Sequence, residues 1–182
     1  MTVYLIRHAA TAGNLRKAYI GRTDEPLCTE GRNALQAIQA PQCVHLFASP
    51  MRRCIETAQI LYPFRTPVCC DALRECDFGD FEGKNYHDLN GDAVYQAWID
   101  SGGTLPFPHG QSPDAFKARC VRAFLELTAD LTETAAFVVH GGTIMAVCEA
   151  LHGGDYYSYH LPNGGIYRAD WDGEHLTHLE KL

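Results

Sequence analysis

Two histidines in this sequence each follow directly on an apolar run that is typical of a buried strand. The apolar run Val3–Ile6 leads into the pair Arg7-His8, and His140 comes after a run that ends in Val139. A neutral imidazole can act as a nucleophile, and a guanidinium carries a fixed positive charge that suits phosphate. Because chemistry in open α/β sheets occurs where strands end, this pairing indicates phosphoryl transfer at a histidine.

Other polar residues lie where they could complete such a site. Arg53 follows a second strand-like run, and its planar fork can bind phosphate oxygens. Asn14 can donate an amide hydrogen bond to the same group. Gly141 opens a predicted helix, whose unobstructed backbone amides and positive dipole end favour an anion. His140, if protonated, would add a positive charge opposite His8.

Several blocks of sequence occur in an order that is typical of one protein family. They are Arg7-His8 with Thr11 and Asn14; Gly21, Asp24, Pro26-Leu27 and Thr29-x-Gly31; Ser49 to Arg53 with Glu56-Thr57-Ala58; Leu73 to Gly83; and Val138 to Gly142. Together they span nearly the whole chain. In these blocks the chain resembles the histidine phosphatase superfamily, in its phosphoglycerate mutase-like branch. The resemblance implies an α/β fold and a phosphohistidine formed on His8 and hydrolysed by water.

The resemblance also assigns the general acid to Glu75, in an acidic loop. A carboxyl group in a partly desolvated cleft can stay protonated, whereas nearby arginines favour its charged form, so the sequence leaves its charge open. Asp77, Asp80 and Glu82 are rival carboxylates in the same loop. The predicted site contains no metal, and it consists of His8, Glu75 and His140 as catalytic residues and Arg7, Asn14, Arg53 and Gly141 as phosphate-binding residues.

Four positions depart from the family pattern or bear on the type of enzyme. Ala9 replaces the usual glycine after the nucleophile and restricts the backbone there. Family mutases place an arginine where Cys76 stands, an arginine pair near the position of Trp98, and an asparagine in place of Gly142. A mutase must hold a carboxylate-bearing intermediate with such cations, so their absence favours a phosphatase. The α-ribazole-5′-phosphate phosphatase-like group is the most similar branch in size.

We therefore expect a phosphoric monoester hydrolase that acts on a small-molecule phosphomonoester. Two alternatives are mutase-type phosphoryl transfer and a catalytically inactive phosphate- or partner-binding module on the same fold. Retention of His8 and Glu75 argues against the inactive module, because binding alone needs no nucleophile. Tyr86, Trp98 and Phe107 could line an aromatic leaving-group pocket, belong to the core or lie at the surface.

The composition sets further bounds. A chain of 182 residues is expected to form one domain, residues 1–182, and 46% hydrophobic content is typical of a globular protein. A net charge of −7 argues against nucleic-acid and membrane binding. With no signal peptide, we expect a cytoplasmic protein whose eight cysteines are reduced and mostly buried. We expect no cofactor, and no oligomeric state is predicted.

The pattern of elements predicts how these residues are positioned. We expect strands at 3–6, 44–47, 67–70 and 136–139, and helices at 30–39, 52–61, 93–100, 113–131 and 143–151. Residues 165–171 and 176–179 flank an Asp-Gly turn and predict a β-hairpin. Residues 84–110 predict a short insertion over the active site. The expected fold is a three-layer α/β/α sandwich with a mostly parallel central sheet.

Overall fold

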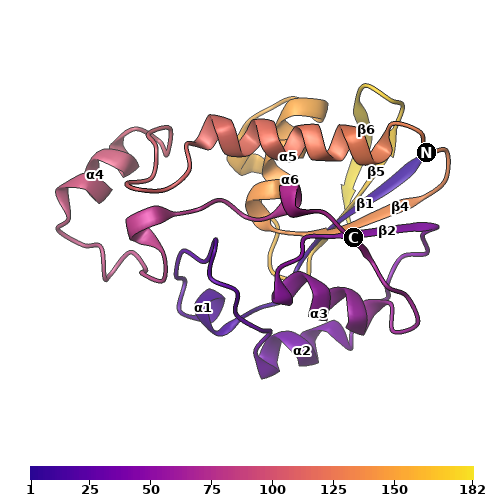
Figure 1. Ribbon diagram of the computed structural model, residues 1–182, viewed down its shortest axis with the longest axis horizontal. Coiled ribbons are helices and arrows are strands. Elements are labelled where there is room, and N and C mark those ends of the chain that lie inside the picture. The colour runs from indigo at the N-terminus through magenta and orange to yellow at the C-terminus, as the bar shows by residue number, and fades with distance from the viewer.

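A six-stranded, mostly parallel sheet forms the centre of the computed structural model, which describes residues 1–182 (Figure 1). Its spatial order is β3-β2-β4-β1-β5-β6. The four strands β3, β2, β4 and β1 are parallel, and β5 and β6 run antiparallel at one side, which confirms the C-terminal hairpin. The strands are β1 (Thr2–Arg7), β2 (His45–Ala48), β3 (Val68–Cys69), β4 (Ala135–Val139), β5 (Ile166–Trp171) and β6 (Leu176–Lys181).

Helices cover both faces of this sheet, so the predicted three-layer sandwich is confirmed. Alternate residues of a strand point to opposite faces. Leu5 packs in one hydrophobic cluster with Phe124 and Ile144, on the face of α5 and α6, whereas Ile6 packs in another with Ala58, on the face of α2 and α3. The helices are α1 (Ala12–Leu15), α2 (Thr29–Leu35), α3 (Arg52–Leu61), α4 (Ala93–Asp100), α5 (Pro113–Thr128) and α6 (Gly141–His152).

Local sequence explains where the helices begin and end. Ser112 caps α5 by accepting a hydrogen bond from the N–H of Ala115, and Pro113 starts its first turn. The predicted helix at 30–39 ends earlier, at Leu35, because the next residues form tighter i→i+3 hydrogen bonds ahead of Pro41. The helix predicted at 113–131 ends at Thr128. The four-residue helix α1 was missed, since one turn leaves no hydrophobic periodicity.

The insertion builds a third, smaller hydrophobic cluster beside the sandwich. Phe81, Tyr95, Trp98 and Phe107 pack there against Phe116 of α5. Short 3₁₀ helices, η1 (Asp71–Leu73), η2 (Gly79–Phe81) and η3 (Tyr156–Tyr159), shape the loops around it. Figure 1 shows α4 standing away from the sheet, at the far left of the view. Packing in this cluster therefore holds the loops beside it in place.

The cysteines and the helix lengths bear on two further expectations. All eight cysteines are free thiols; four are buried, three are half-buried and one, Cys69, is exposed. None of the helices combines the length and the apolar character that crossing a bilayer requires.

Candidate active site

The register of two parallel strands brings the two predicted histidines together. Arg7 of β1 pairs with Val139 of β4, and the backbone N–H of His8 donates to the carbonyl of Val139 at 2.9 Å. The next residues, His8 and His140, therefore leave the sheet side by side. Their rings meet edge to face, with centroids 5.2 Å apart and planes at 68°. The structure thus brings the two strand-end histidines together.

The surroundings of His8 suit it to act as a nucleophile. Its Nδ1 lies 2.7 Å from the carbonyl oxygen of Ala9, so Nδ1–H is the donor and Nε2 keeps a free lone pair. Burial, reinforced by the positive charges of Arg53 and Arg7, lowers the pKa of His8 well below its ordinary value. The imidazole is therefore neutral near pH 7, which is the form that can attack phosphorus.

Ala9 fits its position without backbone strain. Its backbone φ is not positive, and its N–H donates to Oγ1 of Thr57 at 3.0 Å. Its side chain packs in the hydrophobic cluster of α3. The substitution for the family's usual glycine consequently leaves the loop after His8 well anchored.

His140 is held by a hydrogen bond at each ring nitrogen. Its Nδ1 accepts from Nε of Arg53 at 3.2 Å, and its Nε2 donates to Oγ of Ser49 at 2.8 Å. Burial is the largest cause that lowers its pKa well below the ordinary value, and the charge of Arg53 adds to it. His140 is therefore neutral in this arrangement, and the positive charge beside it belongs to Arg53.

Arg53 is fully buried and its donors meet protein acceptors. Besides His140, it donates to the carbonyls of Thr23 and Gly21, both at 2.8 Å, and to that of Ile20 at 3.4 Å. It thus ties the loop that precedes α2 to the second histidine. The sequence predicted a strand-end arginine at the site, but it did not show that its guanidinium also holds this loop.

Arg7 keeps hydrogen-bond donors free at the site. Its Nη1 donates to the carbonyl of Leu161 and, at 3.2 Å, contacts Nε2 of His160. Its Nε is buried and has no hydrogen-bond partner. A Cβ atom at Gly141 would lie 3.3 Å from the Arg7 guanidinium, so the glycine allows the guanidinium to approach the start of α6. An unpaired buried N–H beside a helix N-terminus suits an anion.

Glu75 lies against the same helix start. Its two carboxyl oxygens accept hydrogen bonds from the backbone N–H groups of Cys76, at 3.0 Å, and Gly142, at 3.1 Å. Burial raises the pKa of Glu75 above its ordinary value, although these two bonds and the charges of Arg53 and Arg7 oppose the rise. A carboxyl group with a raised pKa can hold a proton for a leaving oxygen.

The rival carboxylates have other partners. Asp77 accepts from the N–H of Gly79 and lies 3.5 Å from Arg22, while Asp80 pairs with the exposed His109. Glu82 accepts from the N–H groups of residues 21 and 23 in the loop that Arg53 also binds. Of these four acidic residues, only Glu75 lines the cavity that Arg7 and Gly141 line.

Asn14 belongs to a network that shapes the loop after His8. It forms a capping box with Thr11 at the start of α1, and its Oδ1 accepts from Nδ2 of Asn163 at 3.1 Å. Asn163 also donates to the carbonyl of His8 at 3.1 Å. The side-chain amide nitrogen of Asn14, Nδ2, has no protein partner and is free to donate. Sequence reasoning missed Asn163 and His160, because both lie in a segment before β5 without a recognisable motif.

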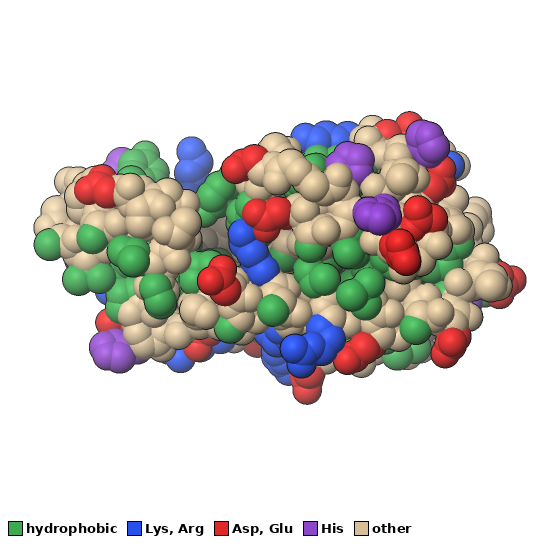
Figure 2. Space-filling view, turned by 90° about the horizontal axis from the view of Figure 1, so that it is seen from above, with side chains coloured by type: hydrophobic (Ala, Val, Ile, Leu, Met, Phe, Trp, Pro, Cys, Tyr) green, Lys and Arg blue, Asp and Glu red, His purple; other side chains and the backbone are tan.

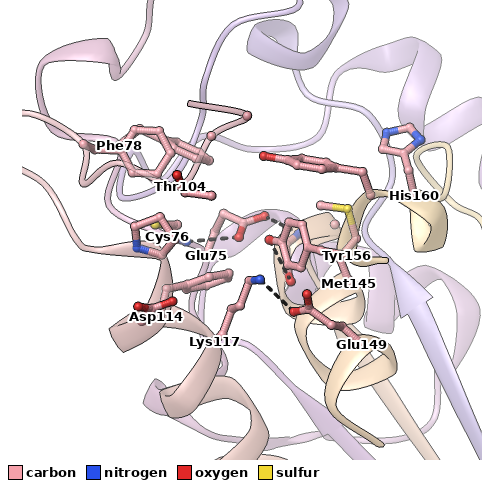
Figure 3. Close-up of a pocket in the computed structure, with 18 of the residues that line it drawn as sticks. Glu75, Cys76, Phe78, Thr104, Asp114, Lys117, Met145, Glu149, Tyr156 and His160 are labelled. Atoms are coloured by element: carbon pink, nitrogen blue, oxygen red, sulfur yellow. Dashed lines mark hydrogen bonds and ion pairs between the residues drawn. The ribbon is translucent and has the colours of Figure 1, made fainter. Parts of the chain in front are cut away.

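A cavity of about 430 Å³ opens beside these groups, between the insertion and helices α5 and α6 (Figures 2 and 3). Arg7, Glu75, Gly141 and Gly142 line one end. Of the aromatic candidates, Trp98 and Phe107 line the cavity, whereas Tyr86 is exposed elsewhere. His8, His140 and Arg53 are buried and do not line the cavity. The cavity thus offers space for an alcohol group next to a recessed nucleophile.

The chain is similar to known proteins over nearly its whole length. The model of the histidine phosphatase superfamily (branch 1) matches residues 3–181. The protein named "Putative phosphoserine phosphatase 2" of Hydrogenobacter thermophilus is 29% identical over 99% of this chain and 95% of its own length. The crystal structure of a phosphoglycerate mutase from Thermus thermophilus is 31% identical, with a TM-score of 0.78 over 100% of this chain and 99% of that chain. The α-ribazole phosphatase of Shigella flexneri, 23% identical, shares the fold with a TM-score of 0.85 over 100% of this chain and 96% of that chain.

Proposed function

This chain belongs to the histidine phosphatase superfamily (branch 1), and on that premise we propose that it hydrolyses a small-molecule phosphomonoester through a phosphohistidine at Nε2 of His8. The observation that carries the proposal is the fixed tautomer of His8. Its Nδ1–H is bound to the carbonyl of Ala9, so the lone pair of Nε2 is available to the phosphorus atom.

The reaction divides into two displacements with complementary proton transfers. In the first, Nε2 of His8 attacks phosphorus, the P–O bond to the alcohol breaks, and the Glu75 carboxyl gives its proton to the leaving oxygen. In the second, the Glu75 carboxylate takes a proton from water, whose oxygen attacks phosphorus, and the P–N bond breaks. Inorganic phosphate leaves and His8 is neutral again. The raised pKa of Glu75 favours the protonated carboxyl that the first step requires, and the carboxylate left after that step is the base of the second.

Fixed positive charge and backbone donors stabilise the transferring group in this proposal. Arg7 supplies an unpaired Nε–H, and Gly141 lies at the N-terminus of α6, where amide donors favour an anion. The free amide of Asn14 is a third donor. Arg53 and His140 contribute as a hydrogen-bonded pair, in which the arginine supplies the charge and orients the imidazole beside His8.

The charges that line the cavity favour hydrolysis over mutase-type transfer. A mutase must hold a carboxylate-bearing intermediate while it turns, which calls for cations. Apart from Arg7, Lys117 is the only lysine or arginine that lines this cavity, and its Nζ is paired with Glu149 at 2.7 Å. The name of the Hydrogenobacter relative supports a phosphatase, whereas that of the 31% identical Thermus structure makes mutase activity the alternative to test.

The proposal is tested with a panel of phosphomonoesters that includes O-phosphoserine, α-ribazole phosphate and 3-phosphoglycerate. We expect release of inorganic phosphate from some members and its loss in the His8→Ala variant. Conversion of 3-phosphoglycerate to 2-phosphoglycerate without net phosphate release would show a mutase. Absence of both reactions, together with absence of a phosphoenzyme, would leave the inactive binding module as the correct description.

A further inference from the structure

Aromatic side chains dominate the part of the cavity that lies away from the phosphoryl end. They come from four places: the segment after α1, the acidic loop with the insertion, helix α5 and helix η3. Several are already packed edge to face or tilted against one another, with Phe78 and Phe107 centroids 5.0 Å apart and Trp98 and Phe107 centroids 5.2 Å apart. The aromatic residues that line this chamber are Tyr19, Phe78, Trp98, Phe107, Phe116, Tyr156 and Tyr157.

The two sides of this chamber that the insertion and η3 form are held in place by packing. Trp98 is 9% exposed and belongs to the insertion's hydrophobic cluster, so its indole is held by packing. A Cβ atom at Gly103 would lie 2.4 Å from the hydroxyl of Tyr157 and 3.2 Å from the Trp98 ring, so the insertion and η3 approach each other closely there. Rigid aromatic walls favour a flat ligand, since offset and edge-to-face contacts need little reordering.

The charged groups of the chamber are mostly negative. Lys117 is paired with Glu149 at 2.7 Å, and its Nζ lies 4.3 Å from the centre of the Tyr156 ring. Figure 3 shows these three side chains together at the cavity. Asp114 and Asp155 also line the chamber, are exposed, and form no ion pair. Arg7, Glu75 and His160 lie at the phosphoryl end of the cavity. In the rest of the chamber, Lys117 and the three carboxylates of Asp114, Glu149 and Asp155 give a net charge of −2. A second anionic group on the substrate would therefore meet like charge and no free cation.

We propose that the chamber selects phosphomonoesters whose alcohol carries a planar aromatic ring and no negative charge. The inference rests on the proposed function for the position of the phosphoryl group, next to Arg7 and Gly141. The aromatic walls supply the contact area, and Asp114 and Asp155 repel anionic alcohols at the mouth. Because both carboxylates are exposed, this repulsion should weaken as the ionic strength rises.

Three synthetic esters with similarly weak leaving groups test the proposal: benzyl phosphate, 4-carboxybenzyl phosphate and cyclohexylmethyl phosphate. Their alcohols are alike in acidity, so differences in kcat/KM report recognition by the chamber. We expect benzyl phosphate to exceed each of the other two by about tenfold, as one stacked ring or one like-charge contact warrants. Equal kcat/KM for the benzyl and 4-carboxybenzyl esters, or a preference for the carboxylate, would overturn the proposal.

Two variants separate the parts played by charge and by ring contacts. In Asp114→Asn/Asp155→Asn, asparagine keeps the cap that Asp155 provides to η3, and discrimination against the 4-carboxybenzyl ester should fall severalfold. Glu126→Gln/Asp130→Asn, an equal charge change at two exposed positions at the end of α5, is the matched control and should keep the ratio of the parent. Tyr157→Ala removes a half-exposed ring and should narrow the preference for benzyl over cyclohexylmethyl phosphate.

Binding of unreactive analogues distinguishes failure of this inference from failure of the proposed function. Benzylphosphonate and 4-carboxybenzylphosphonate have no scissile P–O ester bond to the alcohol, so calorimetric Kd values depend on recognition alone. Tighter binding of benzylphosphonate with no turnover of any ester would refute the proposed function and uphold the chamber's selectivity. Hydrolysis of the esters with equal Kd values for both phosphonates would uphold the function and refute the selectivity.

Discussion

The carboxyl group of Glu75 and the backbone of Gly142 are in such close contact that no side chain fits between them. The N–H of Gly142 donates to Oε2 at 3.1 Å, and a Cβ atom at residue 142 would lie 2.4 Å from Oε1. The first turn of α6 therefore sets the position of the acid as well as that of His140. A side chain at residue 142 would therefore displace the Glu75 carboxyl group.

Gly142→Ala should displace the acid without unfolding the protein. Alanine suits a helix better than glycine, by about 1 kcal/mol, which offsets crowding against Phe116. Loss of a positioned general acid should lower kcat for an alkyl phosphate by about 100-fold, whereas an aryl phosphate, whose leaving group needs little protonation, should lose less. Steady-state kinetics with both esters, alongside thermal unfolding, measure the effect. Unchanged kcat for the alkyl ester would contradict the placement of Glu75.

Glu75→Gln tests the proton itself. Glutamine keeps the shape of the side chain but has no carboxyl proton to give, so the loss should grow with the pKa of the leaving alcohol. A series of aryl and alkyl phosphates gives the slope of log kcat/KM against that pKa, which should be steeper than in the parent. Asp80→Asn, at an exposed carboxylate of the same loop, is the control and should leave the slope unchanged. Equal losses for all esters would move the acid to another residue.

The two shifted pKa values predict a bell-shaped pH dependence. The pKa of His8 is lowered by burial and by the nearby arginines, so the nucleophile is active above this lowered value and lost as pH falls through it. The pKa of Glu75 is raised by burial, so the acid is active below this raised value and lost as pH rises through it. Single-turnover rates of phosphoenzyme formation from an alkyl ester should follow this bell. In Glu75→Gln the alkaline limb should disappear, and its persistence would count against the assignment.

Arg53 should matter to stability as well as to turnover. Arg53→Met leaves two buried acceptors, the carbonyl of Gly21 and Nδ1 of His140, without their donor, together with the partly buried carbonyl of Thr23. Stranded buried acceptors of this kind should cost on the order of 3 kcal/mol in the free energy of unfolding. The neighbouring Arg52→Met, at an exposed surface ion pair, should cost less than about 1 kcal/mol. Chemical denaturation of both variants compares them, and equal losses would show that the buried network is not as described.

The sequence was sufficient to predict the strand-end residues of the site. Apolar runs identify β1 and β4 and place His8 and His140 at strand ends. The pairing of β1 with β4, which brings the two rings together, is visible only in the structure. The layers of the sandwich follow from alternating strands and amphipathic helices. The segment that carries Asn163 has no periodicity or motif, so its hydrogen bond to the His8 carbonyl is visible only in three dimensions.

Protonation and hydrogen-bond partners were the other part that required the structure. The sequence left open whether His140 is protonated. In the structure its ring is neutral, because the charged guanidinium of Arg53 donates a hydrogen bond to its Nδ1. The tautomer of His8 depends on a carbonyl one residue away, and that contact depends on the local backbone path. Similarly, the type of residue at 75 does not show that its carboxyl is bound by two backbone amides.

The most direct test of this account is the chemical identity of the phosphoenzyme. Rapid acid-free quenching of the protein with ³²P-labelled benzyl phosphate, followed by alkaline digestion and separation of the two phosphohistidine isomers, locates the label. Because Nδ1 of His8 is bound to the Ala9 carbonyl, we predict an alkali-stable, acid-labile label on Nε2 that is absent in His8→Ala. Label on Nδ1, label retained in His8→Ala, or turnover by that variant at the parent's rate would contradict the account.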